Sequence, residues 1–311
     1  MRNFLIIPIL FIFLVSCSNS EDFDIPKISK LEKLEEHSNQ FIKGIYSYDN
    51  GIHVAIGFGI ANSIMVEGEG GNIIIDTTDD VSQAKEVLSE FQKINQNPIK
   101  AIIYTHNHGD HVFGASEFYN AQEEKPLVIS HSTTAEKVEK ILGIINPIIT
   151  VRSGKMFGTN LDEDELINVG LGPYLSAGRS SPGYIAPTMT FEKELKLEIA
   201  GHKVELYHAP GETDDQLFVW FPELSALMPG DNFYTTFPNL YTIRGTSHRD
   251  VIGWVNSIDK MRSLDPQYLF PSHTMPVVGE EISNALIIYR DGMQYVHCLL
   301  YTSDAADDSP S

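Results

Sequence analysis

Four side chains that can bind a metal ion lie within six residues of the chain: His106, His108, Asp110 and His111. They follow residues 99–104, a continuous apolar run that is typical of a buried strand. Residues two apart in an extended segment point to the same side, so His106 and His108 can bind one ion. The chain then turns, which lets Asp110 and His111 face a second ion. Imidazole with carboxylate is a ligand set typical of zinc, so this segment predicts a metal centre.

Further motifs follow the histidine loop in a fixed order. They are Asp76-Thr77 at a predicted strand end, the histidine loop itself, Pro-Gly at 210–211, Gly-Asp at 230–231 and Ser-His at 272–273. In this order the sequence resembles the metallo-β-lactamase superfamily, from about Tyr46 to His297. The resemblance implies that Asp76 holds the metal-binding loop in place.

The later motifs resemble one branch of that superfamily, the alkyl sulfatases that hydrolyse detergents such as dodecyl sulfate. Lactonases and related hydrolases place a histidine just after the Pro-Gly turn, where this chain has Glu212. The resemblance implies two zinc ions per chain. The implied ligands are His106, His108 and Glu212 for the first ion, and Asp110, His111 and His273 for the second. Asp231 is expected to bridge both ions, although the family usually has glutamate there, and the shorter side chain would tighten or shift the metal pair.

Asn239 and Arg244 match the residues that hold the sulfate group in alkyl sulfatases. A guanidinium offers two parallel donors, which suit an oxyanion, although a surface ion pair is the alternative role for Arg244. The expected reaction is hydrolysis of an alkyl sulfate to alcohol and sulfate by metal-bound hydroxide, with Asp110 and Asp231 as catalytic carboxylates. The resemblance also suggests attack at carbon, with cleavage of the C–O bond.

The charges of this ligand set are consistent with a sulfate ester as substrate. Two zinc ions bring four positive charges, which Glu212, Asp110, Asp231 and one hydroxide neutralise. A neutral centre polarises a carbonyl less well than a more positive one but can still hold hydroxide. Sulfate is a weak base and therefore needs little help as a leaving group.

Two other functions remain open from the sequence. One is another hydrolase of the same superfamily, such as a lactonase, thioesterase or β-lactamase, which Glu212 argues against. The other is a non-catalytic binding lipoprotein that is stabilised by metal ions. A ligand set for two ions argues against that alternative, because structural zinc sites normally close around one ion.

Composition excludes several partners. The chain has 311 residues, with 22 Lys and Arg against 42 Asp and Glu, and a net charge of −20. Nucleic acid as a partner is unfavourable, because phosphate contacts need clustered Lys and Arg. Electrostatic binding to anionic lipid is unfavourable for the same reason. A small anionic amphiphile, held by local cations, remains the expected substrate.

The first 16 residues resemble a bacterial lipoprotein signal peptide. Residues 4–15 are apolar but too short to span a bilayer comfortably. Leu14-Val15-Ser16-Cys17 resembles a lipobox, in which the cysteine carries the lipid. An ordinary signal peptide or an uncleaved anchor is the alternative. The segment predicts a protein of the cell envelope, anchored through Cys17 on the periplasmic face of a bacterial membrane.

The chain is expected to divide into a polar tether at 17–40, with room for one short helix, and a catalytic domain at 41–278. Residues 279–297 resemble the start of the helical dimerisation region of alkyl sulfatases, which implies a homodimer of the full-length protein. Residues 298–311 resemble a translated sequencing adapter, with a disordered tail as the alternative, and we expect no continuation of the helix there.

Periodicity predicts the elements that position these residues. Strands are expected at 62–66, 72–76, 99–104, 127–130, 195–199, 203–207, 217–220, 226–228 and 268–270, and helices at 81–94, 133–145, 249–263 and from 279 onward. This order predicts an α/β fold of the αββα type, a sandwich of two mixed β-sheets flanked by helices. Residues 152–190 are expected to form a long loop, in which Tyr174, Arg179 and Tyr184 can line an alkyl channel. His131 and His208 are expected to be structural, whereas His248 can face substrate or cap a helix.

Overall fold

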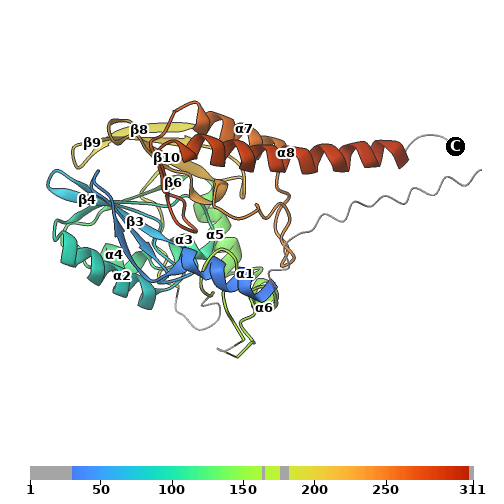
Figure 1. Cartoon of the computed structure of the whole chain (residues 1–311). Coiled ribbons are helices and arrows are strands. Elements are labelled where there is room, and N and C mark those ends of the chain that lie inside the picture. Colours follow the sequence, from blue (N-terminus) through green and yellow to red (C-terminus); the bar gives the residue numbers. More distant parts are fainter. Residues whose placement is uncertain (1–29, 163–164, 176–181, 308–311) are drawn as a thin grey trace, which may run out of the picture.

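The computed structural model describes residues 30–162, 165–175 and 182–307. Two β-sheets lie face to face, and helices cover their outer sides in four layers (Figure 1). The predicted αββα sandwich of two mixed sheets is therefore confirmed. The signal peptide, Cys17 and Arg179 lie outside the described residues.

The first sheet contains seven strands in the order in which they occur in the chain. They are β1 (Gly44–Ser47), β2 (Ile52–Ile56), β3 (Ser63–Gly68), β4 (Gly71–Ile75), β5 (Ile99–Ile103), β6 (Leu127–His131) and β7 (Met189–Phe191). Strands β1 to β4 are antiparallel neighbours, and β4 to β7 are parallel. Because carboxyl ends of parallel strands meet at one edge, Asp76 after β4 and His106 after β5 lie close together.

The second sheet contains six strands in the order β13-β12-β11-β10-β9-β8. They are β8 (Glu194–Ile199), β9 (His202–His208), β10 (Leu217–Phe221), β11 (Ala226–Met228), β12 (Tyr268–Leu269) and β13 (Val277–Val278). Strands β11 and β12 are parallel, so Asp231 and His273, which follow them, also share an edge.

The helices form the outer layers. They are α1 (Lys30–His37), α2 (Val81–Ile94), α3 (Gly109–Val112), α4 (Ala115–Asn120), α5 (Thr134–Leu142), α6 (Asn146–Met156), α7 (Val251–Arg262) and α8 (Glu281–Asp307), with short 3₁₀ turns η1 (Ser38–Phe41), η2 (Pro222–Leu224) and η3 (Gly230–Asn232). Helices α2 and α4 cover the first sheet, and α7 and α8 cover the second (Figure 1). None of the described helices has both the length and the apolar character needed to cross a bilayer.

Alternation along the strands divides the apolar side chains between these layers. Ile73 and Ile75 of β4 belong to the cluster between the sheets, whereas Ile74 packs toward α2 and α4. A third cluster lies between the second sheet and helices α7 and α8, around the fully buried Trp254. Burial of each such large side chain contributes about 1.5–3 kcal/mol, so all three clusters stabilise the edge on which the metal-binding residues lie.

Strands β1, β2, β7 and β13 and helices α3 and α4 lie where the sequence predicted no such element, and three further segments also differ from the prediction. Helix α6 includes residues that were expected to begin the long loop. The sequence did not predict this helix because its apolar residues lie on several sides and leave no periodic stripe. Helix α8 continues without a break through residues 298–307, where no continuation was expected. Part of the predicted tether is folded onto the domain, since Nδ2 of Asn168 donates to the carbonyl of Leu34 in α1 at 2.8 Å.

Candidate metal centre

Three chain segments meet at the edge where the parallel strands end. His106 and His108 follow β5, and the next turn is α3, which contains Asp110 and His111. Asp231 lies in η3 after β11, and His273 follows β12. Gly230 has φ of 59°, a left-handed conformation that favours glycine, and a Cβ there would collide with the side chain of Gln216. This tight turn brings Asp231 back toward the histidines.

The side chains form two groups that can each hold a metal ion, namely His106, His108 and Asp231, and Asp110, His111 and His273. Within each group the ligand atoms lie within 4.8 Å of one another. All of these residues were expected to bind metal, and the structure brings them together. It places Asp231, rather than Glu212, in the first group.

Asp231 lies between the two groups. Its Oδ2 is 3.6 Å from Nε2 of His106, 3.4 Å from Nε2 of His111 and 3.2 Å from Nε2 of His273. Asp110 approaches the second group only, with Oδ2 3.4 Å from Nε2 of His111 and 3.5 Å from Nε2 of His273. Asp231 therefore contacts histidines of both groups, and its assignment as a bridging ligand stays a prediction.

The pattern of unsatisfied atoms fits bound cations. Among the described residues, Nε2 of His111, Oε2 of Glu212 and Oδ1 of Asp231 are buried without a hydrogen-bond partner. Buried polar atoms are normally paired, and each of these atoms is a metal-ligand type. The opposite ring nitrogens are held: Nδ1 of His111 by Asp76 at 2.8 Å, and Nδ1 of His273 by the carbonyl of Ile60 at 2.9 Å. Such bonds direct Nε2 toward an ion.

Titration behaviour differs between the two groups. Burial lowers the pKa of His106 to about 4, and burial likewise lowers the pKa of His108. These imidazoles are therefore neutral, which metal binding requires. Burial opposes the charging of His273 as well, but the carboxylates of Asp231 and Asp110 outweigh it and raise the pKa to about 9. The carboxylate pair therefore makes a strongly negative site that attracts cations.

Glu212 lies beside the first group. It follows Gly211, where a Cβ would collide with Oδ1 of Asn232, and that same oxygen accepts the backbone N–H of Glu212 at 3.3 Å. Oε1 of Glu212 is 3.9 Å from Nδ1 of His108. Burial raises the pKa of the Glu212 carboxyl to about 7, although Arg249 lowers it. Glu212 is thus near enough to join the first group, and its assignment as a ligand stays a prediction.

Arg249 is a residue of the site that the sequence reasoning did not identify. Its Nη2 donates to Oε1 of Glu212 at 2.7 Å, and its Nη1 donates to the carbonyl of Asn239. From the sequence, Arg249 was expected only at the start of a helix. The available signal was a second arginine five residues after Arg244, shortly beyond the segment that carries Asn239 and Arg244.

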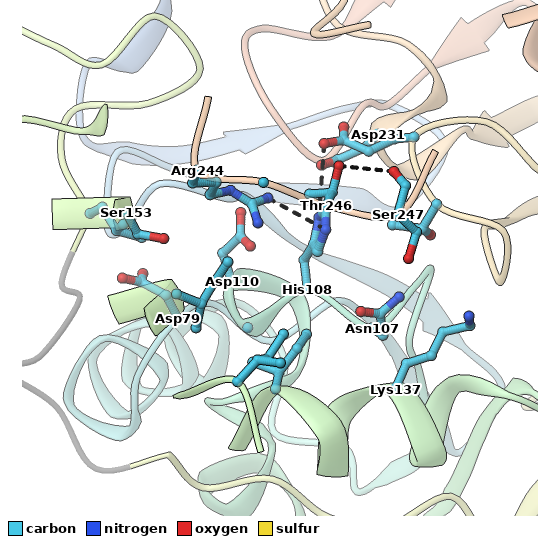
Figure 2. Close-up of a pocket in the computed structure, with 18 of the residues that line it drawn as sticks. Asp79, Asn107, His108, Asp110, Lys137, Ser153, Asp231, Arg244, Thr246 and Ser247 are labelled. Atoms are coloured by element: carbon cyan, nitrogen blue, oxygen red, sulfur yellow. Dashed lines mark hydrogen bonds and ion pairs between the residues drawn. The ribbon is translucent and has the colours of Figure 1, made fainter. Parts of the chain in front are cut away.

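A cavity of about 580 Å³ opens onto the metal-binding groups. Arg244 and Asn239 both line it, and Nη2 of Arg244 lies 3.5 Å from Nε2 of His108. Figure 2 shows the Arg244 guanidinium extending toward His108 above the Asp110 carboxylate. Apolar side chains line much of the cavity, and polar ones from α5 and α6 lie among them. The apolar residues are Phe113, Ile141, Leu142, Ile145, Ile149, Met156, Phe157, Leu171, Leu175 and Pro182, and the polar residues are Glu136, Lys137, Lys140, Asn146, Thr150 and Ser153.

The remaining predicted residues fall into two sets. The rings of His131 and His208 stack at 4.1 Å, and neither is among the described residues that line the cavity, as expected for residues with a structural role. His248 does line the cavity. Tyr174 and Tyr184, which were expected to line an alkyl channel, are not among the described residues that line the cavity. Tyr174 donates to the carbonyl of Phe58 at 3.1 Å, and the ring of Tyr184 packs 6.0 Å from that of Tyr104.

An αββα sandwich whose strand ends gather histidines and aspartates into two adjacent groups defines the class of metallo-β-lactamase folds. The family model described as Metallo-beta-lactamase superfamily matches residues 56–273, and the chain belongs to that superfamily.

Individual relatives are alkyl sulfatases. The chain is 39% identical over 240 residues to the linear primary-alkylsulfatase of a Pseudomonas species, covering 75% of this chain and 45% of the relative. It superposes on the stereoselective inverting sec-alkylsulfatase Pisa1 from Pseudomonas sp. with a TM-score of 0.80 at 22% identity, over 90% of this chain and 47% of that one. A metallo-beta-lactamase from Pontibacter korlensis gives a TM-score of 0.54 at 17% identity, and the match covers 81% of this chain and 98% of that one. The chain thus spans about half the length of the curated relatives it matches.

Proposed function

We propose that the protein is a dinuclear zinc hydrolase that cleaves alkyl sulfate esters to alcohol and sulfate. The observation that carries this proposal is the placement of Arg244 in the cavity, 3.5 Å from His108, in a cavity that apolar side chains also line. A cavity that is lined by both a cation and apolar side chains suits a substrate with an anionic head and an alkyl chain. The similarity to a linear primary-alkylsulfatase supports the same substrate class.

The residues that would hold the metal ions are the two groups described above, with Glu212 completing the first and Asp231 between them. When bound, zinc ions supply a nucleophile at neutral pH, because they lower the pKa of water to roughly 7. The buried imidazoles of His106 and His108 remain neutral and therefore available as ligands. Asp110 and Asp231 are the carboxylates that keep this pocket negative and orient the attacking group.

Arg244 and Asn239 would bind the sulfate group of the ester. Arg244 contributes a forked pair of donors, and the developing charge on the leaving sulfate is paired with its guanidinium. Asn239 is fixed from both sides, since its backbone N–H donates to Oη of Tyr234 at 3.1 Å and its carbonyl accepts from Arg249. The alkyl chain would then extend along the wall formed by α5 and α6.

The proposed attack is at carbon, with cleavage of the C–O bond. The test is hydrolysis in oxygen-18 water with the products separated by mass. The label is expected in the alcohol, and label in the sulfate would show cleavage of the S–O bond instead.

The function is tested by parallel assays of the zinc-loaded protein on dodecyl sulfate, a lactone and nitrocefin. Sulfate release from dodecyl sulfate is expected, and it should disappear in His106→Ala, which lacks a metal ligand. Turnover of the lactone or nitrocefin without sulfate release would point to another hydrolase of the superfamily. Zinc binding with no turnover of any ester would favour a binding lipoprotein.

We also propose that the protein is anchored through lipid on Cys17 in the cell envelope and that its full-length form is a homodimer. The motif around Cys17 and the similarity of the 279–297 segment to a dimerisation region support these two proposals. Labelled fatty acid should be incorporated into the wild type but not into Cys17→Ala. Light scattering of the purified full-length protein should give twice the mass of one chain.

A further inference from the structure

Arg249 is a buried arginine with two partners that belong to different parts of the site. Only 4% of its surface is exposed. One nitrogen of the guanidinium donates to Glu212, beside the first metal-binding group, and the other donates to the backbone of Asn239, in the segment that carries Arg244. It immediately precedes Asp250, whose carboxylate caps helix α7, so its backbone is fixed by that helix.

The pairing of Arg249 with Glu212 requires an explanation beyond stability. Burying an ion pair removes two charges from water, and apolar replacements are often as stable or more stable. Both side chains of this pair are nearly inaccessible, with 1% and 6% of their surface exposed. A pair that contributes little net stability but holds two groups in a fixed geometry is better explained by an organising role.

The two carboxylate oxygens of Glu212 have different surroundings. Oε1 of Glu212 is occupied by Arg249, while Oε2 of the same carboxylate is buried without a partner among the described residues. The guanidinium therefore selects which oxygen stays available for an ion. Arg249 does not itself appear among the described residues that line the cavity, unlike Arg244. It acts through its neighbours rather than on the substrate.

We propose that Arg249 is a positioning residue that presents Oε2 of Glu212 to the first metal ion and, with the same guanidinium, fixes the Asn239 segment for anion binding. This inference rests on the proposed function for the identity of the anion, but not for the metal. Bonds of this kind to a metal ligand typically change metal affinity or activity by about 10–100-fold when removed. Because a single planar group links both partners, metal binding and anion binding are coupled.

The experiment compares Arg249→Met with Arg249→Lys in the full chain, using zinc alone and then inorganic sulfate as probes. Arg262→Met is the matched control, since Arg262 lies at the other end of helix α7 from Arg249 and pairs with Asp259 away from the site. Zinc affinities are measured by competition with a chromophoric chelator, which resolves the two sites. Sulfate affinity is measured by calorimetry on the zinc-loaded proteins.

In Arg249→Met we expect one zinc site to weaken by about 10–100-fold while the other stays within about threefold of wild type. Arg249→Lys should keep zinc affinity through its charge, but it should bind sulfate more weakly, because an ammonium cannot bridge both partners. Wild-type zinc affinities in Arg249→Met would overturn the proposal, as would equal weakening of both sites. If that variant does not fold, Arg249→Lys decides alone, and unchanged sulfate affinity would refute the coupling.

The zinc measurements separate this inference from the proposed function. Selective loss of one zinc site together with no sulfatase activity in the wild type would support the positioning role and contradict the function. Sulfatase activity in the wild type with unchanged zinc binding in Arg249→Met would support the proposed function and contradict the positioning role.

Discussion

Oδ2 of Asp76 lies 2.8 Å from Nδ1 of His111, and both side chains are fully buried where the first sheet ends. The same carboxylate accepts the backbone N–H and the hydroxyl of Thr105, each at 2.9 Å, and the hydroxyl of Ser272 at 2.7 Å. Asp76 therefore joins the segments that follow β4, β5 and β12. Its φ of 55° is unusual for a residue other than glycine, and these bonds hold that conformation.

Asp76→Asn is expected to weaken zinc binding by about 10–100-fold, because it replaces an accepting oxygen by a donor and removes a bond that orients a ligand. Competition with a chromophoric chelator measures the change. Asp49→Asn is the control, since the Asp49 side chain accepts a hydrogen bond from Tyr268 at the surface, away from the metal-binding groups. Equal zinc affinities in wild type and Asp76→Asn would show that the carboxylate has no part in metal binding.

Asp231→Asn should lower the zinc content by one ion per chain and reduce sulfate release by about 100-fold or more. The reason is that its carboxylate lies within 3.6 Å of a ring nitrogen of three histidines, between the two metal-binding groups. Elemental analysis of dialysed protein measures the content. Asp259→Asn, which loses ion pairs with Arg262 and Arg290, should keep the full content. Retention of both ions by Asp231→Asn would rule out a bridging role.

Much of this site was predictable because its information is local. The spacing of His106, His108, Asp110 and His111 after an apolar run encodes both the strand end and the side on which each ligand points. Helix α2 has regular apolar spacing and a cap at Asp80, which accepts from the N–H groups of Ser82 and Gln83, so its bounds were predicted at residue level. Glycine and proline at the turns fixed the places where later ligands enter.

The rest depends on long-range contacts that no local pattern encodes. Arg249 and Glu212 are 37 residues apart, and their pairing follows only from the packing of α7 beside the turn after β9. The grouping of Asp231 with His106 and His108 likewise depends on how the two sheets meet. Helix α6 was missed because its exposed Ile148 and Val151 give it no apolar stripe, and its packing against the cavity replaces that signal.

Arg244→Ala is expected to lower kcat/KM for dodecyl sulfate by about 100-fold, since hydrogen bonds to a charged group contribute about 1.5–3 kcal/mol and each 1.4 kcal/mol is a factor of about ten. The kcat/KM of Arg244→Lys should lie between those of the wild type and Arg244→Ala, because lysine keeps the charge without the forked donors. Zinc content should be unchanged in both variants. Steady-state kinetics with a sulfate assay provide the measurement, and wild-type kinetics in Arg244→Ala would remove the anion-binding role.

The loss of folding stability at acid pH is expected to depend on the stacked rings of His131 and His208. Burial, together with the charge of His208, lowers the pKa of His131 below 6.5, while the Glu192 carbonyl and the carboxylates of Asp215 and Asp214 raise it. The unfolded chain therefore binds more protons below that pH, and the stability present above it is lost as pH falls.

His131→Gln should flatten this dependence between pH 7.5 and 5, which denaturant unfolding of both proteins without metal can measure. An equal decline in the two proteins would assign the acid sensitivity to other groups.

Substrate chain length should depend on Ile149, an apolar residue of α6 that lines the cavity. Ile149→Trp would fill space that a long alkyl chain needs. Excluding about two methylene groups, at about 0.8 kcal/mol each, should lower kcat/KM for dodecyl sulfate about tenfold relative to hexyl sulfate. Ile148→Trp is the matched control, because Ile148 is 58% exposed and is not among the described residues that line the cavity. Identical ratios of dodecyl to hexyl turnover in both variants and wild type would place the alkyl chain elsewhere.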